Sequence, residues 1–102
     1  MQSKSPTPIQ ITATVVAVGV SYFSDSTART RITTDKGEIM FSGVAFFRKS
    51  DVISAEGKYV MMPELDQHTR ELLADLSPGK SVFRAKEISE ETTGVTLRDL
   101  AT

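Results

Sequence analysis

The order of alternating segments along the chain constrains its fold more than any other sequence feature. Three segments in which apolar and polar residues alternate come first, one amphipathic segment follows, and two more alternating segments come last. A period of two predicts β-strands, and the wider apolar spacing of the amphipathic segment predicts a helix. The predicted strands cover 9–22, 27–34, 38–47, 81–88 and 95–100, and the predicted helix covers 63–76. This order, with one helix between the third and fourth strands, predicts a mainly β fold built as a small closed five-stranded barrel.

The first predicted strand changes character along its length. Its early part carries apolar residues at odd positions, from Ile9 to Ala17, with polar residues between them. Further on, the even positions from Val16 to Val20 are apolar as well, which predicts a strand buried on both faces. Gly19 is where we expect a bulge or a bend, because a bent first strand helps a small barrel to close.

Turn residues mark the connections between the first strands. Ser24-Asp25-Ser26 predicts one turn, and Asp35-Lys36-Gly37 predicts a tight hairpin because Gly37 can adopt a positive φ. Residues 48–62 leave two alternatives open. Their last part, 58–62, fits a short strand, whereas 54–57 fits a loop.

The predicted helix begins at Pro63, a residue suited to a first helical turn, and Ser77-Pro78-Gly79 ends it. Its leucines form one stripe, which we expect to plug an open end of the barrel and complete the core. The stripe consists of Leu65, Leu72, Leu73 and Leu76.

Length and composition indicate one domain and exclude thiol chemistry. With 102 residues the chain can bury its own core, and without cysteine it forms no disulfide or zinc–thiolate site. Residues 1–8 are polar, contain two prolines and resemble a disordered leader rather than a secretory signal, so we assign 9–102 to the barrel domain. These features predict a soluble, cytoplasmic protein with no membrane association.

The distribution of charge is more informative than the net charge of −1, which comes from 12 basic and 13 acidic residues. Acidic residues gather in the predicted helix, and basic residues gather on the predicted strands. If those strands share a face, that face is positive. The alternative is that the charges only solvate exposed strands. The strand bases are Arg29, Arg31, Lys36, Arg48, Lys49, Arg84 and Lys86.

The chain resembles the OB-fold, the oligonucleotide/oligosaccharide-binding barrel, in its β-β-β-α-β-β order. Residues 76–83 (Leu-Ser-Pro-Gly-Lys-Ser-Val-Phe) are similar to the entry into that fold's fourth strand, and 94–100 are similar to its closing strand. The likeness spans about nine-tenths of the chain and is one of pattern, because the fold has no diagnostic motif.

This resemblance implies that the chain binds single-stranded nucleic acid, DNA or RNA, across the second and third strands. Bases would stack on exposed rings and basic side chains would neutralise phosphates. Because strand neighbours face opposite sides, one ring of each adjacent aromatic pair must point inward. The implied site comprises Tyr22, Phe23, Arg29, Arg31, Lys36, Phe46, Phe47, Arg48 and Lys49, with Met40 on the same strands and with Arg84 and Lys86 on a later strand.

No residue pattern predicts catalysis, a metal site or a cofactor. His68 is the only histidine, so no histidine pair can form, and we interpret it as an ordinary surface residue. No Gly-x-Ser-x-Gly turn or phosphate-binding glycine loop occurs. We therefore expect a binding protein rather than an enzyme.

A second hypothesis keeps the barrel but changes its partner. Phe46, Phe47, Met61 and Met62 would form an apolar patch that binds a protein without nucleic acid. The near-neutral charge and the low aromatic content of 7% favour this alternative. Under the first hypothesis we expect a homo-oligomer, because avidity strengthens a weak site. No positive feature supports a third possibility, a barrel for sugars or other small ligands.

Overall fold

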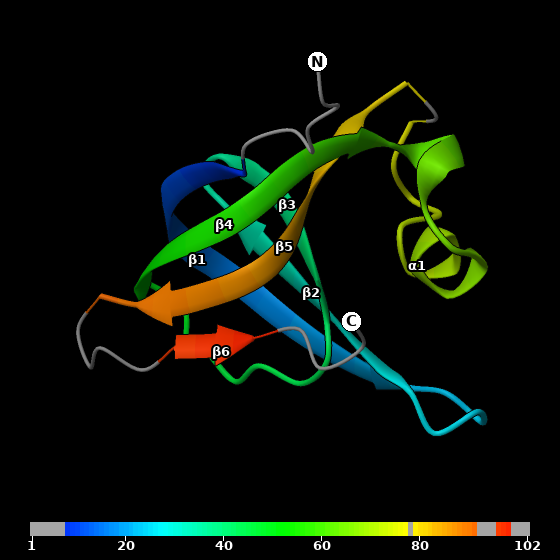
Figure 1. Ribbon diagram of the computed structural model, residues 1–102, viewed down its shortest axis with the longest axis horizontal. Coiled ribbons are helices and arrows are strands. Elements are labelled where there is room, and N and C mark those ends of the chain that lie inside the picture. Colours follow the sequence, from blue (N-terminus) through cyan, green and yellow to red (C-terminus); the bar gives the residue numbers. More distant parts are fainter. Residues whose placement is uncertain (1–7, 78, 92–95, 99–102) are drawn as a thin grey trace, which may run out of the picture.

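A closed ring of five strands forms the body of the protein (Figure 1). The computed structural model describes residues 8–77, 79–91 and 96–98. Around the ring, β1 is followed by β2, β3, β5 and β4, which pairs again with β1; the β3–β5 pairing is parallel. The predicted mainly β, closed five-stranded barrel is confirmed. The strands are β1 (Ile9–Tyr22), β2 (Ala28–Thr34), β3 (Gly37–Ser42), β4 (Val52–Met61), β5 (Ser81–Glu90) and β6 (Thr96–Arg98).

The fifth member of the ring is β4, which comes from the stretch that the sequence left open. Its first half pairs with β1 and nearly its whole length pairs with β5. The helix follows β4 instead of β3, although it precedes the 81–90 strand as expected. The predicted last strand lies partly outside the described residues; its described part, β6, pairs with β5 beside the ring and is not one of its five members. The leader at 1–7 also lies outside them.

A β-bulge explains the change of character along β1. Val15 pairs with Thr34 and Ala17 pairs with Thr33, so Val16 is an extra residue on β1, and its side chain is exposed. The inward positions therefore change from odd before the bulge to even after it, where Val18 packs on the core. The expected burial of both faces and the expected bend at Gly19 were wrong.

The barrel core fills the inside of the ring with residues from all five strands and from the loop that follows β3. Thr30 is fully buried there, and its hydroxyl donates to the carbonyl of Gly43 at 2.7 Å and accepts from the amide of Ala45 at 3.1 Å. These bonds fix the loop against the barrel. The barrel core consists of Val15, Ile32, Ile39, Phe41, Ala45, Phe47, Ile53, Ala55, Phe83, Ala85 and Ile88.

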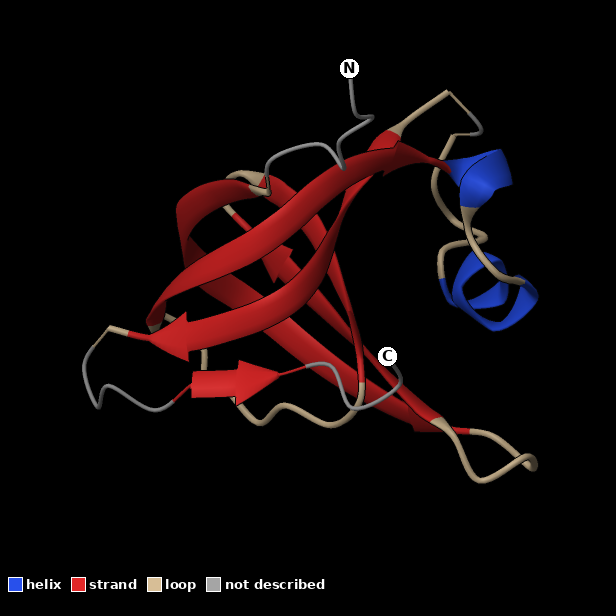
Figure 2. Cartoon of the chain, viewed as in Figure 1, coloured by secondary structure: helices blue, strands red, loops and turns tan. Residues whose placement is uncertain are grey.

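The third predicted strand is shorter than expected and stops at Ser42. Gly43 has φ of 136°, a conformation that favours glycine, and it turns the chain into the loop 43–51 that runs beneath the barrel in Figure 2. In the predicted hairpin turn at 35–37, Gly37 has the expected positive φ, 114°.

The predicted helix is broken into two short pieces, the 3₁₀ turn η1 (Met62–Glu64) and α1 (Gln67–Leu72). Asp66 lies between them in an extended conformation, and its side chain accepts from the amide of Thr69, so it caps α1. We refer to residues 62–76 as the helical segment. Figure 1 shows it beside the barrel, not inside it.

The apolar side chains of the helical segment form a second cluster, separate from the barrel core, which corrects the expected plug. Met40 on β3 and Val82 on β5 come from the outward faces of strands whose next residues point into the barrel. Leu73 is fully buried against them. This outer cluster consists of Met40, Val60, Met62, Leu65, Leu73 and Val82, with Leu72 and Leu76 partly buried around it.

Candidate nucleic-acid interface

One register row on the outside of the barrel crosses four neighbouring strands and carries a basic side chain on three of them. Arg31 on β2 pairs with Met40 on β3, Met40 pairs with Arg84 on β5, and Arg84 pairs with Lys58 on β4. Register partners share a face of a sheet, so the row faces outward with Met40. Strands about 4.8 Å apart give the row a length of about 14 Å. Lys86, two residues beyond Arg84, extends it along β5.

The bases on the β4 and β5 half of this row are exposed among the described residues. Lys58, Arg84 and Lys86 are exposed, and no side-chain hydrogen bond or ion pair joins them to another residue in the described part of the chain. Along β4 and β5, these bases are followed by an acidic pair, Glu56 and Glu87, which are register partners. We call the set Arg31, Lys58, Arg84 and Lys86 the basic face.

The β2 half of the row is occupied by the protein's own carboxylates. Arg31 donates to Asp75 through both terminal nitrogens, at 2.7 and 3.0 Å, and to Glu38 at 2.8 Å. One of its terminal nitrogens also donates to the carbonyl of Leu72 at 3.0 Å. Arg29, on the same side of β2, lies 3.3 Å from Asp66. Both arginines thus contact the helical segment, so the face that the sequence predicted as a ligand site is partly covered.

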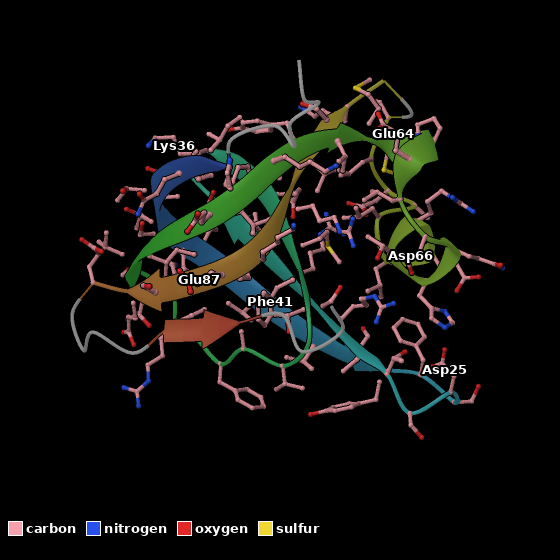
Figure 3. The ribbon with its side chains drawn as sticks, in the orientation of Figure 1. Asp25, Lys36, Phe41, Glu64, Asp66 and Glu87 are labelled. Atoms are coloured by element: carbon pink, nitrogen blue, oxygen red, sulfur yellow. The ribbon has the colours of Figure 1, made fainter. Side chains whose placement is uncertain are left out.

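The tip of the β1–β2 hairpin is tied to the same segment. The rings of Phe23 and His68 stack with centroids 3.9 Å apart and planes 14° apart. His68 also lies 3.0 Å from Asp25, which is an ion pair when the imidazole is protonated. Figure 3 shows Asp25 at the hairpin tip and Asp66 on the helical segment, on the same side of the molecule. We call this contact the joint; it comprises Phe23, Asp25, Arg29, Arg31, Asp66, His68 and Asp75.

The carboxylates of the joint are held in their charged form. Hydrogen bonds from Thr27 and His68 lower the pKa of Asp25 to about 2. Burial raises the pKa of Asp66, but hydrogen bonds from Thr69 and the charge of Arg29 outweigh it and lower the pKa. A hydrogen bond from Arg31 lowers the pKa of Asp75, and Asp75 together with Glu38 raises the pKa of Arg31. The joint is therefore fully ionised at neutral pH on its acidic side.

Apolar burial holds the helical segment more strongly than these ion pairs do. Exposed ion pairs contribute about 0–1 kcal/mol each, and the carboxylates of Asp66 and Asp75 are 49% and 63% exposed. A fully buried apolar side chain contributes about 1.5–3 kcal/mol, and the outer cluster contains several buried ones. The carboxylates can thus separate from the arginines while the segment stays packed on the barrel.

The four predicted aromatic residues differ in exposure, although Phe23, Phe46 and Phe47 lie outside the strands, where strand alternation does not apply. Tyr22 and Phe46 are 70% and 76% exposed, Phe47 belongs to the barrel core, and Phe23 stacks on His68. Phe47 is therefore not available as a stacking surface. Tyr22 and Phe46 are the rings that remain open to a ligand.

The remaining predicted bases do not lie in the row. Lys36 is in the β2–β3 turn, where its amine donates to the carbonyl of Thr12 on β1, and Figure 3 shows it far from Asp25. Arg48 and Lys49 are exposed on the loop before β4. The predicted site residues thus fall into separate groups, and only Arg31, Arg84 and Lys86 belong to the basic face.

Sequence reasoning missed Lys58 and Tyr59, because β4 was not assigned as a strand. Lys58 faces Arg84, and Tyr59 is 47% exposed with its ring packed edge-on against Phe83. Alternation around Lys58 is obscured by Gly57, whose lack of a side chain is required: a Cβ there would lie 2.0 Å from the carbonyl oxygen of Arg84. Tertiary contact with β5 was the missing signal.

Among the described residues, no group of three or more histidine or acidic side chains is arranged to hold a metal ion. None of the helices in this part of the chain has the length and apolar character needed to cross a membrane. Comparisons of the chain with protein-family models, curated proteins and solved structures found no match.

Proposed function

We propose that this barrel binds single-stranded nucleic acid, DNA or RNA, through its basic face. The observation that carries the proposal is the register row from Arg31 to Lys58, in which the bases on β4 and β5 form no ion pair with a described residue. Phosphates are the ligand groups that such side chains attract, and Arg84 can offer two parallel donors to one of them. A closed five-stranded barrel compatible with the OB-fold supports the same ligand class.

Two features favour a single strand over a duplex. The exposed part of the row is short, because Lys58 and Arg84 lie on neighbouring strands about 4.8 Å apart, and it suits neighbouring phosphates of one strand. Tyr22, Phe46 and Tyr59 present exposed rings outside the row, and unpaired bases stack on such rings at about 1–3 kcal/mol per base. We expect weak, sequence-tolerant binding, since most contacts would go to phosphates.

The test is fluorescence anisotropy with labelled oligo-dT, the matching RNA and a duplex, each at several salt concentrations between 50 and 200 mM as suits phosphate contacts. Three free cations predict a slope of log K against log salt of about −2, at about −0.7 per phosphate on a single strand. The double variant Lys58→Gln/Arg84→Gln should reduce the slope by about 1.4 and weaken binding to all sequences.

A matched control separates the basic face from general attraction. Lys36→Gln/Lys49→Gln removes the same charge from exposed positions outside the row. We expect its salt slope to stay at the wild-type value. Equal losses in both double variants would remove the basic face as the site, and no binding to any strand by the wild type would remove the proposal.

The protein-partner hypothesis loses its predicted patch. Phe47 and Met62 are each 9% exposed, while Phe46 and Met61 are exposed on different elements, the loop 43–51 and the end of β4. A homo-oligomer stays a prediction under the proposed function, because repeated weak sites gain from avidity. Light scattering after size-exclusion chromatography measures it.

A further inference from the structure

We infer that the acidic end of the helical segment is an internal competitor for the binding face, and that nucleic acid exchanges its phosphates for Asp75 on Arg31. This inference rests on the proposed function and adds a regulation to it. In the structure as it stands, the basic face has an open half at Lys58 and Arg84 and a closed half at Arg31. Exchange would add a phosphate contact at Arg31, on the far side of Met40, which the helical segment keeps buried.

The geometry of the Arg31–Asp75 pair is that of a phosphate contact. Both terminal nitrogens of Arg31 donate to the two carboxylate oxygens of Asp75, at 2.7 and 3.0 Å. This two-pronged arrangement is the one through which arginine also recognises phosphate. Asp75 therefore occupies the donors that a phosphate at the β2 end of the row would use.

Asp75 is free to leave without disturbing the rest of the joint. Its side chain is 63% exposed and lies beyond the end of α1, which stops at Leu72. Arg31 would keep Glu38 and the carbonyl of Leu72 as partners, so its guanidinium stays fixed on the row. The buried Leu73, two residues away, keeps the segment on the outer cluster during the exchange.

Arg29 and Asp66 form a second arginine–carboxylate ion pair, but a phosphate would displace Asp66 less readily than Asp75. Asp66 also caps α1 by accepting from Thr69, so releasing it would expose the helix end. Arg29 is more buried than Arg31. The competition therefore centres on Asp75.

The test compares Asp75→Asn with Glu71→Gln by anisotropy titration on oligo-dT. Both variants remove one negative charge from an exposed position of the segment, four residues apart, but Glu71 bonds Gln67 and no arginine among the described residues. We expect Asp75→Asn to bind about fivefold tighter at low salt and to steepen the salt slope by about 0.7, the value for one added phosphate. Glu71→Gln should leave the slope unchanged.

Arg31→Lys supplies the second arm, because lysine keeps the charge but loses the paired donors. Combined with Asp75→Asn, it should remove most of the gain; made alone, it should weaken binding by a smaller factor, because Asp75 already competes with the phosphates for Arg31 in the wild type. Equal tightening in Asp75→Asn and Glu71→Gln would show general electrostatics and overturn the inference while leaving the proposed function in place.

The two failures are distinguishable. If Lys58→Gln/Arg84→Gln weakens binding but Asp75→Asn leaves the affinity unchanged, the inference about Asp75 is wrong and the proposed function stands. Binding that appears only in Asp75→Asn removes the proposed function of the wild-type protein, and the inference that rests on it falls with it. No binding by any of these variants, with circular dichroism showing them folded, sinks both.

Discussion

The barrel core and the joint are held together by different forces. The barrel core is a closed ring of backbone pairing around eleven buried apolar residues. The joint connects the hairpin tip and β2 to the helical segment through half-exposed ion pairs and one aromatic stack. Burial is insensitive to salt and acid, whereas exposed ion pairs are sensitive to both. The contacts that respond to salt and acid, the ion pairs of the joint, therefore lie outside the barrel core and next to the candidate binding face.

The largest expected effect comes from breaking the barrel core. Phe41→Ala removes one of the largest fully buried side chains and leaves a cavity at the centre of the ring. We expect a loss of about 3–5 kcal/mol in the free energy of unfolding, measured by urea denaturation. A loss below about 1 kcal/mol would mean that the core is not the main source of stability.

The next effect tests the β4–β5 seam of the ring. Gly57→Ala would place a Cβ 2.0 Å from the carbonyl oxygen of Arg84, so two backbones would have to separate. We expect a loss of about 3 kcal/mol by the same measurement. Gly19→Ala is the matched control, because no atom lies within 4 Å of its added Cβ, and it should be neutral or slightly stabilising.

Leu73→Ala sharpens the comparison, since Leu73 anchors the joint rather than the barrel. It is fully buried in the outer cluster, and its loss should cost about 2 kcal/mol, near the low end for such a change. Hydrogen exchange should rise in the helical segment and the hairpin tip while β3 and β5 stay protected. Uniform acceleration across the barrel would show that the two regions unfold as one unit.

The smallest effect is the response of the joint to acid. The folded pKa of Asp25 is about 2, below its ordinary value of 3.8, so the folded protein binds fewer protons than the unfolded chain between these values. The stability that Asp25 contributes is therefore complete above about pH 4 and is lost as the pH falls through 2. Asp66 and Asp75, whose pKa values are also lowered, add to the same trend.

Hydrogen exchange between pH 4 and 2 checks this response. Amides of the hairpin tip and α1 should lose protection before those of the barrel strands. Asp25→Asn should weaken the dependence, because its side chain no longer titrates. An unchanged profile in that variant would assign the acid response to other carboxylates.

Local pattern was sufficient for most of the barrel. The alternation along β1, β2, β3 and β5 and the glycine at the 35–37 turn led to their correct assignment, since these features depend only on neighbouring residues. The pattern failed where a partner strand decides the structure. The bulge at Val16 is defined by the pairing of β1 with β2. Gly57 is required in β4 because the backbone of β5 approaches it closely.

The site shows the same division. Local pattern identified the basic residues that β2 and β5 carry, but the alternation expected for the aromatic pairs did not apply, because Phe46 and Phe47 lie in a loop after β3 has ended. Only the tertiary structure decided that Arg31, Arg84 and Lys58 share one row, since strand order and register join residues far apart in the chain. It also decided that Asp75 occupies Arg31, because a charge can be neutralised by any residue that the fold brings within hydrogen-bond distance.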